Sequence, residues 1–151
     1  MRLVQVASDV WEVLAIEDRD GGSVWAELEH ADAGDVASED MLVTLETEVP
    51  LGGPPRNKRK CRPIGDDILE FKTPAGGGLR VFWFYDVGMP LTRRRIICTH
   101  SSRKVKERKL QQEKRRARHY RDAYIKAKRA SDLEIRDRNG KLVHQKRGPK
   151  T

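Results

Sequence analysis

Short runs of apolar, β-branched and aromatic residues predict four strands along the chain. The first covers residues 10–16 and stops at a turn rich in Asp and Gly. Three more cover residues 68–73, 79–86 and 91–100, and their connections are short and contain Gly or Pro. Connections of this kind favour an antiparallel meander. The stretch before the meander, residues 56–62, is predicted to be a basic loop.

The middle strand of this meander is apolar on both faces. Side chains alternate along a strand, so its residues divide between two faces. One face carries Arg80, Phe82 and Phe84, and the other carries Leu79, Val81, Trp83 and Tyr85. We therefore expect this strand to lie in the centre of the sheet, covered on both sides.

Two short amphipathic helices are predicted between the first strand and the basic loop. Ser23 is a good N-cap for the first helix, and the second opens at Asp35 or Ser38 and closes at Pro50. A third, long helix is predicted over residues 105–129, which contain no Gly or Pro. Its apolar stripe is thin and consists of Leu110, Ala117, Tyr120, Tyr124 and Ala127.

These elements predict a small α/β (α+β) domain over residues 1–130. In this fold the two N-terminal helices pack on a twisted, mostly antiparallel sheet, and the long basic helix follows the sheet. Residues 131–151 are predicted to form a basic C-terminal tail. Within this tail, Asn139-Gly140 lies between apolar pairs and predicts a hairpin with a type I′ turn, followed by a disordered end.

Charge is distributed unevenly along the chain. Residues 1–55 contain 2 Lys or Arg against 13 Asp or Glu, whereas residues 56–151 contain 29 against 10. The second part therefore has a net charge of +19, which attracts an acidic partner at long range. Nucleic acid is the first candidate, and its binding weakens as salt rises.

The remaining composition narrows the class of protein. Cys61 and Cys98 are the two cysteines, and neither lies in a spacing typical of a zinc site or a disulfide framework, so we expect reduced thiols, no metal and no cofactor. No apolar run approaches the roughly 18 residues of a membrane span. The chain is therefore predicted to be cytoplasmic.

The basic residues of the meander fit the chemistry of RNA cleavage without a metal. In that reaction the 2′-hydroxyl loses a proton, cations meet the charge on the phosphate, and the leaving 5′-oxygen gains a proton. Arg is a bidentate donor for phosphate, and His or a Lys with a lowered pKa can move protons. The residues of these types in or after the strands are Lys72, Arg80, His100, Arg103 and Lys104.

Each candidate also has a structural interpretation. Arg80 could pair with a carboxylate such as Glu70, because a charged residue in a central strand needs a partner. Lys72 could be ordinary solvated surface, and His100 could be a hydrogen-bonded packing residue. The run of residues 93–95, which includes Arg94, fits an exposed edge that faces a substrate.

Three segments together resemble the core of the RelE/HigB superfamily of type II toxins, in particular its phage-derived branch. They are ILEFKT (residues 68–73), LRVFWFYDVG (79–88) and RRRIICTHSSRK (93–104). The motif of that branch runs roughly L-[WY]-E-L-R, then Y-R-V-F-Y-F, then L-L-H-x-F-x-K-K before a helix. The resemblance covers about residues 64–125. It implies a small α/β endoribonuclease that cuts mRNA on the ribosome and is silenced by a cognate antitoxin, which typically carries a helix-turn-helix domain.

The resemblance also implies roles for individual residues. Arg80 matches the Arg of the motif and would bind the phosphate, while His100 or Lys72 would carry protons. Arg103 and Lys104 match its basic pair and would bind RNA. Independently of the resemblance, the charge of the long helix predicts that it binds RNA through Arg115, Arg116 and Arg118, and Arg94 is expected to add a further cation.

The chain departs from the motif at Lys72, where Arg is usual, and at Ser102, where an aromatic residue is common. Two other functions therefore stay open. One is a toxin of the same fold that poisons gyrase without cutting RNA. The other is a non-catalytic nucleic-acid-binding phage protein, in which Arg80 would be structural.

Overall fold

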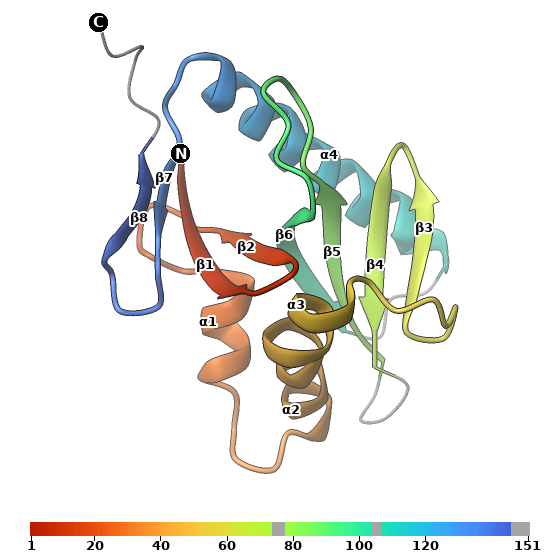
Figure 1. Ribbon diagram of the computed structural model, residues 1–151. Helices are drawn as coiled ribbons and strands as arrows, with labels where there is room; N and C mark the ends of the chain where they lie inside the picture. Colours follow the sequence, from red (N-terminus) through yellow and green to blue (C-terminus); the bar gives the residue numbers. More distant parts are fainter. Residues whose placement is uncertain (74–77, 104–106, 146–151) are drawn as a thin grey trace, which may run out of the picture.

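A mixed sheet runs through the centre of the protein in the computed structural model, which describes residues 1–73, 78–103 and 107–145 (Figure 1). Eight strands form this sheet among the residues that the structure describes, in the order β3-β4-β5-β6-β2-β1-β7-β8. Their bounds are β1 (Arg2–Ser8), β2 (Glu12–Ile16), β3 (Cys61–Gly65), β4 (Ile68–Lys72), β5 (Leu79–Tyr85), β6 (Arg95–Arg103), β7 (Glu134–Arg136) and β8 (Leu142–Gln145).

The predicted meander is confirmed, because β4, β5 and β6 are antiparallel neighbours. The third of these strands begins at Arg95 rather than residue 91, since the chain turns at Arg94 with a φ of 56°. The sheet as a whole is mostly antiparallel. Its parallel pairs are β1 with β7 and β2 with β6.

The sheet is larger than the predicted four strands. β3 forms at Cys61, inside and just after the stretch predicted to be a loop, by pairing with β4. This edge strand contains Pro63, which is tolerated where one side of a strand has no partner. β1 pairs with β2 across a short turn and was also missed. Pairing with a neighbouring strand, rather than local propensity, decides whether such segments form strands.

The predicted helices are confirmed. Ser23 caps α1 (Val24–Glu29) by accepting a hydrogen bond from the Ala26 backbone at 3.1 Å, and Asp35 caps α2 (Val36–Val43). The helical path continues through a π-helical turn, η1 (Thr44–Glu48), into α3 (Val49–Gly52). Pro50 does not end the path, because it lies in the first turn of α3, where a missing N–H is tolerated. The long helix is α4 (Glu107–Arg129).

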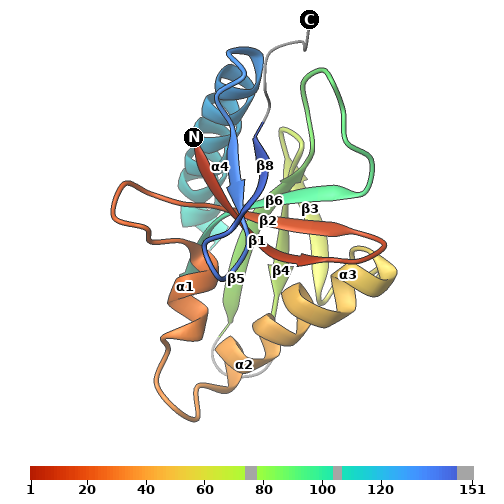
Figure 2. The same cartoon turned by 60° about the vertical axis from the view of Figure 1, so that its left-hand side comes forward.

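Each face of the sheet packs against its own helices, as Figures 1 and 2 show. α1, α2 and α3 cover one face, where Val81 and Trp83 of β5 are fully buried. α4 covers the other face, where Phe82 is fully buried and Phe84 nearly so. The predicted alternation and the central place of β5 are therefore confirmed.

The expected hairpin near the C-terminus is present as β7 and β8. Its turn is not type I′, which needs a positive φ at both central residues. Gly140 has a φ of +83°, whereas Asn139 has no positive φ. Asp137 and Lys141 pair across residues 138–140, which is a three-residue loop with Gly in the left-handed region. β7 also pairs with β1, so the hairpin extends the main sheet. The basic end expected to be disordered, residues 146–151, lies outside the described residues.

The uneven charge along the sequence becomes an uneven charge across the sheet. Residues 17–48, which include α1, α2 and η1, contain eleven acidic residues and one basic residue. α4, on the opposite face, contains ten basic and three acidic residues, a net charge of +7. A polyanion is therefore attracted to the α4 side and repelled from the α1–α2 side. Within the described chain, no helix is both long and apolar enough to cross a membrane.

Candidate functional site

A buried carboxylate binds two arginines on the α4 face of the sheet. Glu70 of β4 is fully buried. Its Oε2 lies 3.0 Å from Nη1 of Arg80, and its Oε1 lies 2.6 Å from Nε of Arg62. The interpretation that Arg80 pairs with Glu70 is therefore confirmed. Two guanidiniums therefore bind one buried carboxylate.

A bulge in β6 turns His100 toward α4. Val81 of β5 pairs with Ser101, but Trp83 pairs with Cys98, so β6 carries an extra residue opposite Phe82. In a regular strand His100 would share the α1 face with Cys98, because side chains alternate. The extra residue moves the imidazole to the α4 face, where it stacks on Phe82 with ring centroids 4.8 Å apart. Bulges often redirect a side chain in this way near active sites.

Both ring nitrogens of His100 have partners. Nδ1 lies 2.9 Å from Oγ1 of Thr99, and Nε2 lies 2.7 Å from Oε2 of Glu113 on α4. The ring is 6% exposed, and this burial lowers its pKa, whereas the hydrogen bond to Glu113 opposes that change. His100 thus has the hydrogen bonds expected of a packing residue, and it also contacts a carboxylate that is 20% exposed.

A hollow of about 70 Å³ opens beside this pair. His100 and Thr99 line it from β6, Glu27 lines it from α1, and Arg116 and Tyr120 line it from α4. The guanidinium carbon of Arg116 lies 6.0 Å from the centre of the Tyr120 ring. The hollow therefore combines an imidazole and a phenol, which can move a proton, with one cation and the carboxylates of Glu27 and Asp18.

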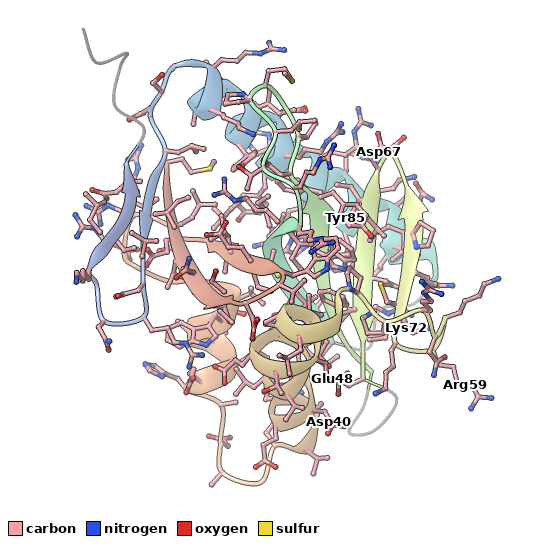
Figure 3. All side chains as sticks on the ribbon, in the orientation of Figure 1. Asp40, Glu48, Arg59, Asp67, Lys72 and Tyr85 are labelled. Carbon is pink, nitrogen blue, oxygen red and sulfur yellow. The ribbon has the colours of Figure 1, made fainter. Side chains whose placement is uncertain are left out.

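Lys72 lies at the end of β4, away from the β3–β4 turn that contains Asp67 (Figure 3). It is directly opposite Arg80 in the antiparallel register, so the two residues share a face of the sheet. Lys72 is partly buried. The structure therefore places Lys72 and Arg80 together on two adjacent strands.

Arg103 is not part of this group. It pairs with Leu79 of β5 and so lies on the face opposite Arg80. Its Nη2 lies 2.7 Å from Asp35 Oδ2 and 2.9 Å from Ser38 Oγ, at the N-terminus of α2. The backbone hydrogen bond from Ser38 and the contact with Arg103 hold the pKa of Asp35 below its usual value. Arg103 thus joins β6 to α2.

The other residues expected to bind RNA are spread along the α4 side and beyond it. Arg115, Arg116 and Arg118 are exposed on α4, and Arg118 Nη1 lies 3.4 Å from Asp66 of the β3–β4 turn. Arg94 is exposed and directly precedes β6, whereas Arg103 is the last residue of that strand. Lys104 lies outside the described residues.

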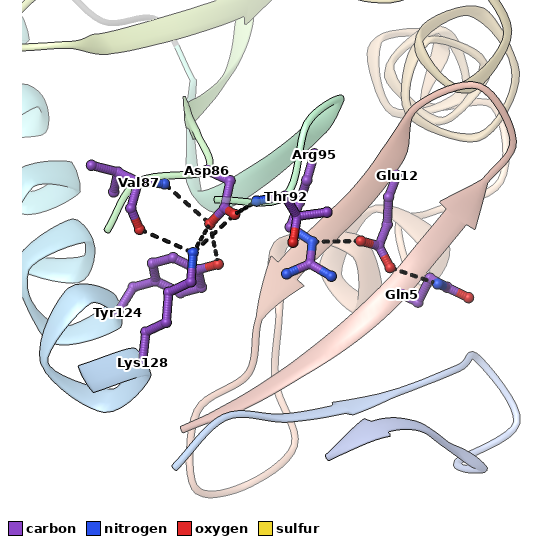
Figure 4. Close-up of polar contacts among 8 residues, drawn as sticks. All are labelled: Gln5, Glu12, Asp86, Val87, Thr92, Arg95, Tyr124 and Lys128. Carbon is purple, nitrogen blue, oxygen red and sulfur yellow. Dashed lines mark hydrogen bonds and ion pairs between the residues drawn. The ribbon is translucent and has the colours of Figure 1, made fainter. Parts of the chain in front are cut away.

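A second polar network was missed from the sequence (Figure 4). Lys128 at the end of α4 is buried, and its Nζ lies 2.9 Å from both oxygens of Asp86. Tyr124 donates to the same carboxylate, and burial raises the pKa of this phenol. Arg95 binds Glu12 nearby, with 2.5 Å between Nε and Oε1.

This network anchors the end of α4 to the loop after β5. Lys128 also donates to the carbonyls of Val87 and Gly88, so its ammonium is surrounded by protein oxygens. One signal in the sequence could have revealed the network. Lys128 lies four residues after Tyr124 and thus continues the apolar stripe of the helix, where a cation needs a buried carboxylate.

Comparisons with protein-family models, with curated proteins and with solved structures found no match to this chain. Among the described residues, no three His, Cys, Asp or Glu side chains are grouped so that they could hold a metal ion. The function is therefore inferred from the chemistry of the described residues.

Proposed function

We propose that this protein is a RelE/HigB-like toxin that cuts mRNA on the ribosome without a metal and is silenced by a cognate antitoxin. His100 is the proton carrier in this proposal, and the exposed arginines of α4 bind RNA. The observation that carries it is the bulge in β6, which brings His100 onto the face covered by the basic helix α4, beside Arg116 and Tyr120.

The proposed reaction is an internal transesterification. The 2′-oxygen of a nucleotide bonds to the adjacent phosphorus while the bond from phosphorus to the 5′-oxygen breaks. The 2′-hydroxyl gives its proton to a base, and the 5′-oxygen receives one from an acid, so the products are a 2′,3′-cyclic phosphate and a 5′-hydroxyl end. A positioned acid or base contributes about a hundred- to ten-thousandfold to such a step.

The arrangement of the chain supports the proposal. The helices of residues 24–52 precede an antiparallel meander of β3, β4, β5 and β6, and a long helix follows the meander, as the resemblance implies. Arg80 and His100 lie on the same face of the sheet as α4, so one bound RNA could contact both residues and the basic helix. Lys72, at the end of β4, also lines a hollow beside α2 and η1. Fold alone does not specify activity, so the side chains carry the argument.

A second candidate function is non-catalytic nucleic-acid binding. The pairing of Arg80 with a fully buried Glu70 favours it, because a guanidinium that neutralises a buried carboxylate has a structural role. In this alternative the basic face of α4 still binds nucleic acid, but no bond is broken. The two functions make the same prediction for RNA affinity and opposite predictions for RNA cleavage.

Primer extension on a translated mRNA, in cells that express the protein without an antitoxin, tests the proposal. Wild type is expected to produce new 5′ ends within the coding region, and His100→Gln is expected to reduce them at least a hundredfold. Asp122→Asn, which removes an exposed charge from α4, serves as the control. If wild type binds RNA and produces no new ends, the non-catalytic function is favoured, whereas toxicity without RNA cleavage favours gyrase as the target.

A further inference from the structure

The hydrogen bonds around His100 limit the places where protons can lie at this site. A continuous series joins four groups: the carbonyl of Phe82, the hydroxyl of Thr99, the imidazole of His100 and the carboxyl group of Glu113. The successive distances are 3.2, 2.9 and 2.7 Å. Each contact needs one hydrogen between its two heavy atoms.

The donors of the series can be assigned from one end. The Phe82 carbonyl can only accept, so Thr99 uses its single hydroxyl hydrogen on that carbonyl. Nδ1 of His100 must then donate to Thr99 Oγ1. The contact between Nε2 and Glu113 needs a further hydrogen, which belongs either to an imidazolium or to a carboxylic acid.

The His100–Glu113 pair therefore binds two protons when all three hydrogen bonds are formed. A neutral imidazole beside an ionised carboxylate has one proton fewer, and one hydrogen bond of the series cannot form. The state with the extra proton therefore keeps one hydrogen bond more than the state without it.

We propose that His100 shares a proton with Glu113, so that the titration of the His100 ring depends on this carboxylate, and that Glu113 is a positioning residue that holds the acidic proton at His100. Its consequence for RNA cleavage rests on the proposed function, because the shared proton is the one that the leaving 5′-oxygen would receive. The titration itself does not depend on that function. In this proposal α4 both binds RNA and contributes Glu113 to the proton-carrying site.

Charged groups from three elements face the imidazole. Glu113 favours the charged form of His100, and Arg116 opposes this form; both residues lie on α4. Glu27 of α1 favours the charged form, and Asp18 lines the same hollow from the loop after β2. Glu113 is the carboxylate within hydrogen-bond distance, so its removal is expected to have the largest effect.

NMR titration of the His100 ring tests the proposal on the purified full chain. Glu113→Gln removes the charge that favours imidazolium, so the midpoint for His100 is expected at a lower pH than in wild type. Asp122→Asn, an exposed carboxylate on the same helix, is expected to leave the midpoint unchanged. An equal or higher midpoint in Glu113→Gln would overturn the proposal.

A second measurement needs no variant. The nitrogen chemical shifts of the wild-type ring report which nitrogen is protonated, and the hydrogen-bond series requires a proton on Nδ1. A ring protonated at Nε2 and not at Nδ1, over the whole pH range in which the protein is folded, would refute the shared proton.

The pH profile of RNA cleavage separates this proposal from the proposed function. If His100 is the acid, the decline of cleavage at high pH is expected to move to lower pH in Glu113→Gln. A shifted NMR midpoint in a protein that cuts no RNA would support the proton-sharing pair and reject the endonuclease. An unshifted midpoint in a protein that does cut RNA would reject the pair and leave the endonuclease standing.

Discussion

Arg80 and Glu70 form an ion pair across two adjacent strands, with 3.0 Å between Nη1 and Oε2. The carboxylate is fully buried, whereas the Arg80 side chain is 14% exposed. Arg62 binds the other carboxylate oxygen, so Glu70 would retain one partner if Arg80 were removed. Any role of Arg80 on a phosphate has to coexist with this structural role.

The pairing predicts a stability cost for Arg80→Ala. Because Arg62 remains, we expect a decrease of about 1–3 kcal/mol in the free energy of unfolding rather than the larger cost of an isolated buried charge. Urea denaturation measures this change. In a Glu70→Gln background the same substitution should cost less, and equal costs in both backgrounds would show that the two side chains do not interact.

Lys128 is predicted to anchor the end of α4. Lys128→Met leaves the carboxylate of Asp86 buried without its cation, and such changes cost about 3–5 kcal/mol. The matched control is Lys126→Met, an exposed position two residues earlier, where a change within about 0.5 kcal/mol is expected. Denaturation of both variants tests this assignment, and equal stabilities would contradict it.

Both thiols are predicted to be unreactive while the protein is folded. Burial raises the pKa of Cys61 to about 11 and that of Cys98 to about 12, and the thiolate is the reactive form. At mildly alkaline pH a disulfide reagent should therefore modify neither residue until denaturant is added. Rapid modification of Cys98 in the native protein would contradict its place in the core.

RNA affinity is predicted to depend on the exposed arginines of α4. Replacing Arg115, Arg116 and Arg118 by Gln should weaken binding and flatten the plot of log affinity against log salt, by roughly 0.7 in slope for each phosphate that the variant no longer binds. The matched control replaces three exposed cations of the loop before β3, Arg56, Lys58 and Arg59. A larger effect from the control would place the RNA surface on that loop.

The sequence predicted the elements whose signal is local. Ser23 and Asp35 cap helices as their residue types suggest, and the alternation along β5 matches its two buried faces. β3 was missed because it forms a strand by pairing with β4. The residue pattern of an edge strand does not reveal such a pairing. The turn at Gly140 was assigned the wrong type, since Asn139 does not take a positive φ.

The candidate site was predicted less completely than the fold. The motif identified Arg80, Lys72 and His100. The structure places Arg80 and His100 on the α4 face, whereas Lys72, opposite Arg80 in the register, also lines a hollow beside α2 and η1. Glu113 could not be found, because its contact with His100 depends on a bulge and on the path of α4 across the sheet. Arg103 was grouped with these residues by its place in the motif, but alternation after the bulge puts it on the other face.

The most direct test of the endonuclease is the chemistry of its products. Purified protein would be incubated with mRNA bound to ribosomes, and the RNA ends analysed. The account predicts new fragments with 2′,3′-cyclic phosphate and 5′-hydroxyl ends, formed by wild type and reduced at least a hundredfold in His100→Gln. Intact RNA with wild type, or equal cleavage by both proteins, would contradict it.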